Sequence, residues 1–89
     1  MVTKEIIVVN RLGLHARPAT LLVKTASQFK SKITLRKDEL VVDAKSIMGV
    51  LILAAQKGSK ILLEVDGADE KEALDAVAKL FNDGFGEEI

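Results

Sequence analysis

The feature that most limits the fold of this 89-residue chain is the alternation of two apolar patterns. Short runs rich in Ile, Leu and Val have the length and composition of strands. Longer segments carry apolar residues three or four positions apart, which is the spacing of a buried helix face. The runs predict strands over 6–9, 32–37, 40–42 and 61–65. The longer segments predict helices from Pro18 to about Phe29, over 47–53, and from Asp69 to about Gly84.

Capping and turn residues mark the ends of these elements. Pro18 fits the first turn of a helix, where its missing N–H costs nothing. Ser46 is a good N-cap for the short helix, and Asp69 followed by Glu72 predicts a capping box for the last one. The residues expected to be buried by the two longer helices are Ala19, Leu22, Val23, Ala26 and Phe29, and Ala73, Leu74, Val77, Leu80 and Phe81.

The order of elements, β-α-β-β-α-β-α, predicts an α+β fold of two layers. Amphipathic helices must bury their apolar faces, so we expect them to cover one face of a mostly antiparallel sheet. The length predicts a single domain over residues 1–89. An apolar fraction of 48% excludes a disordered chain, and with only three Phe and no Trp or Tyr the core must be aliphatic.

Composition also limits the kinds of partner. Thirteen basic residues balance thirteen acidic ones, so no charge excess indicates nucleic acid or an anionic membrane. No apolar run is long enough to span a bilayer, and no secretory signal pattern is found. The sequence has no cysteine, which excludes disulfides and thiolate metal sites. We therefore expect a cytoplasmic domain without membrane insertion.

His15, the only histidine, lies within residues 13–19 (GLHARPA), between the first predicted strand and the first predicted helix. A helix start offers unpaired N–H groups and the positive end of the helix dipole, which favour an anion. Arg17 adds a planar cation that matches phosphate geometry. Because a neutral imidazole is a usable nucleophile, the pattern indicates a nucleophile beside an anion site. A turn with a structural histidine and an unrelated arginine is the alternative.

Ser46 is the second candidate, although an N-cap serine is ordinary and stabilises a helix by about 1 kcal/mol. Its neighbours raise its interest. Ile47, Met48, Leu51 and Ile52 are too many apolar residues for one short helix to bury on a single face. We expect some of them to be exposed as a protein-docking patch. A helix buried on all sides is the alternative.

What the sequence lacks is also informative. It has no phosphate-binding loop for a nucleoside triphosphate, and no second histidine or cysteine that would complete a metal site with His15. We therefore expect no metal and no cofactor, and we interpret the chain as a phosphoryl relay. A stand-alone hydrolase would need a pocket with converging acid and base groups. Glu87, Glu88 and the lysines at 30, 32 and 37 are expected to be solvated surface.

Three stretches resemble the HPr family, the histidine-containing phosphocarriers of the bacterial phosphoenolpyruvate-dependent sugar phosphotransferase system. They are residues 13–19, residues 44–49 (AKSIMG), and residues 61–81 with Asp66-Gly67. The resemblance covers essentially the whole chain in order and without gaps. It implies an open-faced β-sandwich with strand order 1-4-2-3 and three helices on one face.

The resemblance also implies roles for individual residues. His15 would take phosphate on Nδ1 from phosphorylated enzyme I and pass it to IIA domains, with Arg17 and the helix start holding the phosphate. Ser46 would match the serine modified by HPr kinase/phosphorylase. The docking surface would include Thr20, Lys24, Ile47, Met48 and Leu51. Such a protein works as a monomer through a covalent phosphohistidine and is not a stand-alone turnover enzyme.

Residues 50–55 (VLILAA) depart from the commoner pattern, because many relatives carry a small polar residue and a glycine there. The docking patch should therefore be more apolar than usual. This leaves the downstream partner open, because the chain could serve a regulatory or nitrogen-type branch instead of sugar uptake. A second function, a docking module controlled by modification of Ser46, is a further alternative and is compatible with phosphoryl transfer. Regulatory paralogues lack the active histidine, whereas His15 and its motif are intact here.

Overall fold

The computed structural model describes residues 1–89 and contains every predicted element in the predicted order. The elements are β1 (Val2–Ile7), α1 (Ala16–Ala26), β2 (Lys32–Lys37), β3 (Leu40–Asp43), α2 (Ile47–Leu53), β4 (Lys60–Asp66) and α3 (Glu70–Asn82), followed by a 3-10 turn, η1 (Gly84–Gly86). None of these helices has the length and apolar content needed to cross a bilayer.

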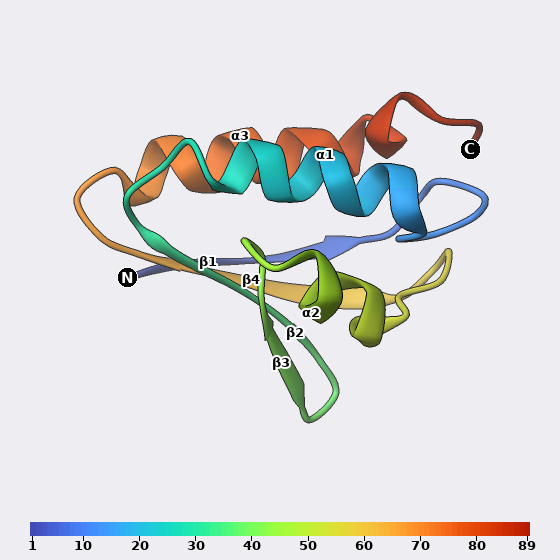
Figure 1. Cartoon of the computed structure of the whole chain (residues 1–89), viewed down its shortest axis with the longest axis horizontal. Helices are drawn as coiled ribbons and strands as arrows, with labels where there is room; N and C mark the ends of the chain where they lie inside the picture. Colours follow the sequence, from blue (N-terminus) through green and yellow to red (C-terminus); the bar gives the residue numbers. More distant parts are fainter.

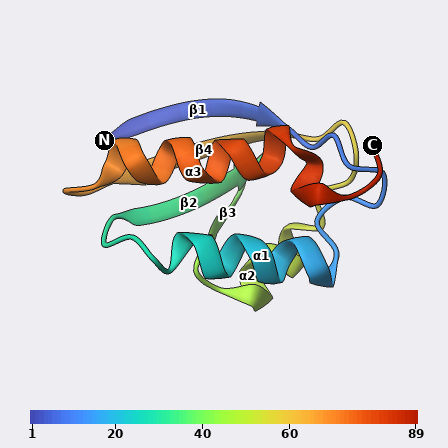
Figure 2. The same cartoon turned by 90° about the horizontal axis from the view of Figure 1, so that it is seen from above.

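The four strands form one antiparallel sheet in the order β1-β4-β2-β3, which confirms the expected topology. Helices α1 and α3 run side by side along one face of the sheet, as Figures 1 and 2 show. The short α2 packs against α1 and β3. The opposite face of the sheet carries no helix, so the fold is an open-faced sandwich of two layers.

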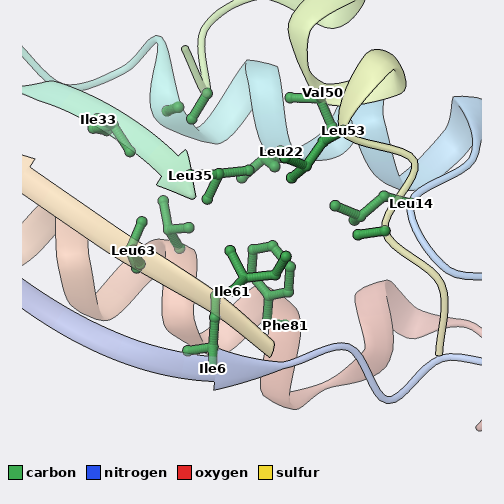
Figure 3. Close-up of a cluster of buried hydrophobic side chains, with 14 of the residues drawn as sticks. Ile6, Leu14, Leu22, Ile33, Leu35, Val50, Leu53, Ile61, Leu63 and Phe81 are labelled. Carbon is green, nitrogen blue, oxygen red and sulfur yellow. The ribbon is translucent and has the colours of Figure 1, made fainter. Parts of the chain in front are cut away.

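The core lies between the sheet and the helices and is almost wholly aliphatic. Side chains from β2 and β4 alternate between the two faces, so Ile33, Leu35, Ile61, Leu63 and Val65 all point inward and are fully buried. Figure 3 shows Leu22 of α1 and Phe81 of α3 pointing toward these strand residues. Val50 and Leu53 join α2 to the same core. The core therefore fixes the ends of α1 and α2 relative to each other.

The observed boundaries differ most from the sequence prediction at two elements. β1 begins at Val2, four residues before the predicted start, and ends at Ile7 instead of Val9. Residues 3–5 are polar and exposed and give no apolar signal, but the backbone pairs with β4 from the partly buried Val2 onward. α1 begins at Ala16 and ends at Ala26, so Phe29 lies beyond the helix and is only partly buried.

The predicted capping box at α3 is wrong. Asp69 is the N-cap residue, but its side chain makes no capping hydrogen bond. Its carboxylate instead accepts hydrogen bonds from the amides of Lys30 and Ser31, both at 2.9 Å, and from the Ser31 hydroxyl at 2.5 Å. Glu70, not Glu72, reaches back and accepts a hydrogen bond from the amide of Gly67. The hydroxyl and amide donors around Asp69 lower the pKa of its carboxyl to about 2.

Candidate functional site

His15 is the N-cap residue of α1 and has extended backbone angles, with φ −78° and ψ −169°. No side chain caps this end of the helix, and the amide N–H groups of Ala16 and Arg17 have no hydrogen-bond partner. Pro18 occupies the first turn and has no N–H to satisfy. The open helix end therefore presents two free donors and a partial positive charge beside the imidazole, which together favour an anion.

The loop before His15 is held by Asn10 and Gly13. The buried Asn10 side chain donates from Nδ2 to the Gly13 carbonyl at 2.8 Å, and the Asn10 carbonyl accepts the Gly13 amide at 3.1 Å. Gly13 has a φ of +67°, and an added Cβ there would lie 2.4 Å from the carbonyl oxygen of Ala55. Only glycine fits this approach. The next amide, of Leu14, donates to the same Ala55 oxygen at 2.9 Å, which fixes the path of the chain into His15.

The imidazole of His15 contacts the carboxylate of Glu87. His15 Nε2 lies 2.8 Å from Glu87 Oε1, and Asn10 Nδ2 donates to the same oxygen at 3.0 Å. Arg17 donates from Nη1 to Glu87 Oε2 at 3.3 Å. An ionised carboxylate only accepts hydrogen bonds, so Nε2 must carry the proton and the Nδ1 lone pair of a neutral ring is left free. No hydrogen bond engages Nδ1.

The charge state of Glu87 follows from these contacts. Burial favours the neutral acid and acts to raise its pKa, since the side chain is only 13% exposed. Hydrogen bonds from His15, Asn10 and Arg17 outweigh that effect and hold the pKa of Glu87 below its usual value. Glu87 is therefore an anion at neutral pH, inside a cluster of donors.

Glu87 reaches the site because the end of the chain folds back over it. Phe85 is buried and packs edge-to-face against Phe81 of α3, with ring centroids 4.9 Å apart. The Glu88 carbonyl then accepts the amide of Arg11 at 2.7 Å. The chain end accordingly lies beside the loop that precedes α1 in both Figure 1 and Figure 2.

The prediction that Glu87 is solvated surface is wrong, whereas Glu88, with a side chain 75% exposed, fits it. The aromatic Phe85 between two glycines is the one sequence signal that this tail is anchored. An open hollow of about 320 Å³ lies at the site, lined by Arg11, Leu12, Arg17, Glu87 and Glu88. The residues that line this hollow do not include His15.

Comparison with known proteins settles the family. The family model described as "PTS HPr component phosphorylation site" matches residues 2–83. The chain belongs to the HPr family. It is 53% identical to the phosphocarrier protein HPr of Treponema pallidum over 88 residues, covering 99% of this chain and 100% of that protein. As a member of the HPr family it is a phosphocarrier of the phosphotransferase system.

Solved HPr structures share the fold. A crystal structure of HPr from Thermoanaerobacter tengcongensis superposes with a TM-score of 0.96 at 46% identity, covering 100% of both chains. A crystal structure of an HPr dimer from the same organism has a TM-score of 0.79 at 48% identity and covers 98% of both chains. HPr folds are therefore observed in dimeric form as well, and the expectation of a monomer stays a prediction for this chain.

The second HPr motif forms the start of α2. Ser46 is its N-cap, as predicted, with Oγ accepting the amide of Gly49 at 3.1 Å. Val50 and Leu53 are buried, while Ile47, Met48, Leu51 and Ile52 are exposed. These four exposed residues are called the α2 patch below. The helix is therefore not buried on all sides, and the expectation of exposed apolar residues is confirmed.

Thr20 and Lys24, the remaining docking candidates, are both exposed on α1. The Thr20 hydroxyl donates to the Ala16 carbonyl of its own helix at 2.8 Å. Since α1 packs against α2, these two residues and the α2 patch belong to neighbouring elements. Lys30 and Lys32 are exposed, which confirms the expectation of solvated surface for both. Lys37 is only partly exposed, and its Nζ donates to the Leu53 carbonyl at 3.2 Å.

Proposed function

We propose that His15 accepts a phosphoryl group on Nδ1 from phosphorylated enzyme I and passes it to a IIA domain. One observation carries the proposal: the imidazole stands at the uncapped start of α1 with Nε2 engaged by Glu87 and Nδ1 without a partner. The ring thus has one nitrogen free for attack. The side chain is 37% exposed, so a donor protein can reach it.

The chemistry requires only groups found at this site and a phosphorylated donor. The Nδ1 lone pair attacks phosphorus, the Nδ1–P bond forms, and the bond from phosphorus to the donor atom breaks with its electron pair returning to the donor. The amides of Ala16 and Arg17 can donate to the phosphoryl oxygens as charge develops on them. Arg17 adds a cation, and its side chain, 63% exposed, can turn from Glu87 to the phosphate.

Incubation with phosphoenolpyruvate and enzyme I tests the proposal. We expect one phosphate per chain, lost in acid as a phosphohistidine is, and passed on when a IIA domain is added. His15→Ala is the control and should take no label from enzyme I. Label retained by that variant would contradict the proposal.

A second function rests on the α2 patch. We propose that phosphorylation of Ser46 by an HPr kinase/phosphorylase controls docking, because Ser46 directly precedes exposed Ile47 and Met48. Thr20 and Lys24 would belong to the same docking surface. The patch also includes Ile52, which is 61% exposed and makes it more apolar than the commoner pattern.

The branch of the phosphotransfer system can be tested with the same assay. Transfer rates measured with sugar-type and with nitrogen-type donor and acceptor proteins should differ if the patch selects the partner. We propose the sugar branch, and faster transfer with the nitrogen-type proteins would assign the chain to that branch instead.

A further inference from the structure

We infer that Glu87 is a positioning residue for phosphoryl transfer, which fixes the His15 ring so that Nδ1 faces the incoming phosphorus. The inference rests on the proposed role of His15. It adds a residue outside the sequence motifs, brought to the site by the fold.

The contacts of Glu87 are those of a built site. Three donors from three residues converge on one carboxylate: His15 Nε2 at 2.8 Å, Asn10 Nδ2 at 3.0 Å and Arg17 Nη1 at 3.3 Å. Asn10 is fully buried and also holds the loop before His15. Phe85 and the Arg11–Glu88 backbone hydrogen bond secure the tail on both sides of Glu87. The carboxylate is therefore held in place by groups other than the imidazole.

The position of the carboxylate suits the charge changes of the reaction. When Nδ1 bonds to phosphorus while Nε2 keeps its proton, the imidazole becomes cationic. Glu87 lies against that proton and stabilises the positive ring. In the onward step a lone pair of the acceptor protein attacks phosphorus, and the new acceptor–P bond forms as the Nδ1–P bond breaks. The electron pair of the broken bond returns to the ring, which leaves as a neutral imidazole. The Nε2 proton stays hydrogen-bonded to Glu87 throughout, so neither step needs another acid or base.

Glu87 also contacts Arg17, which gives a competing interpretation: the carboxylate could occupy the phosphate site and slow the reaction. The geometry favours positioning. The shortest contact is with Nε2, the ring nitrogen that does not take the phosphate, and the Arg17 contact is 0.5 Å longer (3.3 against 2.8 Å). The two interpretations predict rate changes of opposite sign.

The experiment compares the full chain with Glu87→Ala, Glu87→Gln and Glu88→Ala in single-turnover transfer from phosphorylated enzyme I. We expect Glu87→Ala to lower the maximal rate on the order of tenfold, with little change in the half-saturating concentration. Glu87→Gln keeps an acceptor for Nε2–H and should recover part of the rate. Glu88→Ala is the matched control, since its exposed carboxylate reaches only Arg11 at 3.5 Å, and it should transfer normally.

Nitrogen NMR of the His15 ring supplies a readout independent of activity. With the ring neutral, we expect the parent and Glu87→Gln to show a hydrogen-bonded Nε2–H, and Glu87→Ala to show a weakened one. Circular dichroism confirms that each variant is folded. An unchanged rate in Glu87→Ala, a faster rate, or a change confined to the half-saturating concentration would each overturn the inference. A parent chain that takes no label on His15 would instead contradict the proposed function.

Discussion

At the residue scale, Ala54 has a backbone conformation that its Cβ disfavours. It ends α2 in the left-handed region, with a φ of 51°, a conformation that glycine adopts without steric cost. A Cβ costs about 1–2 kcal/mol in this conformation. Glycine removes this cost, but its greater conformational freedom in the unfolded chain cancels part of the gain in stability. The local strain should therefore be removable by substitution.

We predict that Ala54→Gly raises the free energy of unfolding by about 0.5–1 kcal/mol. Ala76→Gly, within α3, is the control and should lower it by about 1 kcal/mol, because glycine is a poor helix former. Urea denaturation of the parent and both variants measures the effect. Equal losses for the two substitutions would show that position 54 has no strain to relieve.

Arg17 is the residue whose charge should matter most for the incoming phosphate. Arg17→Ala removes a charge-assisted contact of about 1.5–3 kcal/mol, which corresponds to a rate loss of roughly ten- to a hundred-fold. Because the side chain is 63% exposed, solvent screening places the expected loss near the lower end. Stopped-flow transfer kinetics with circular dichroism measure it. The transfer rate of Arg17→Lys should lie between those of the parent and of Arg17→Ala. An unaffected rate in Arg17→Ala would mean that the backbone donors suffice.

At the element scale, the start of α2 combines a stabilising cap with a surface for partners. Ser46→Asp adds an anion at a helix start, and the helix dipole makes that charge locally favourable for the fold. The same charge lies beside the α2 patch, so a docking partner would have to remove water from it, which costs binding free energy. We therefore predict weaker binding to enzyme I with an unchanged melting temperature. Ser46→Ala should bind normally and lose about 1 kcal/mol of stability, because the Gly49 amide loses its acceptor.

Titration calorimetry and thermal melts of the three proteins test this prediction. Equal affinities would reduce Ser46 to its capping role. A large drop in melting temperature for Ser46→Asp would mean that the substitution damages the fold and does not switch docking.

Asp69 joins the start of α3 to the loop between α1 and β2. Its folded pKa of about 2 lies below the ordinary value of 3.8, so its hydrogen bonds contribute stability above pH 3.8. That contribution should be lost as the pH falls from 3.8 to about 2. We predict that Ser31→Ala, which removes the hydroxyl donor, loses less unfolding free energy than the parent over this pH range. Unfolding measured across this range tests it, and identical pH dependence in the two proteins would contradict it.

At the scale of the whole molecule, the sequence predicted what depends on local pattern. The helices and strands each carry their own apolar face, as Leu22 and Phe81 illustrate, so their presence and order could be read from spacing. The site was predicted only in part. His15 and Arg17 lie two residues apart in one motif. Glu87, which contacts both side chains, lies 72 and 70 positions later in the sequence. The carboxylate of Asp69 likewise does not cap its helix, since it accepts hydrogen bonds from amides that lie 38 and 39 residues away in the sequence. Contacts of this length leave no periodic signal in the chain.

The proposed function requires that the fold leave one ring nitrogen of His15 free to carry phosphate. Phosphorus and nitrogen NMR of the phosphorylated, isotopically labelled chain tests it most directly. We predict a single phosphohistidine in which phosphorus is bonded to Nδ1 of His15 and Nε2 retains its proton. Phosphorus on Nε2, or on any residue other than His15 after reaction with enzyme I, would contradict it.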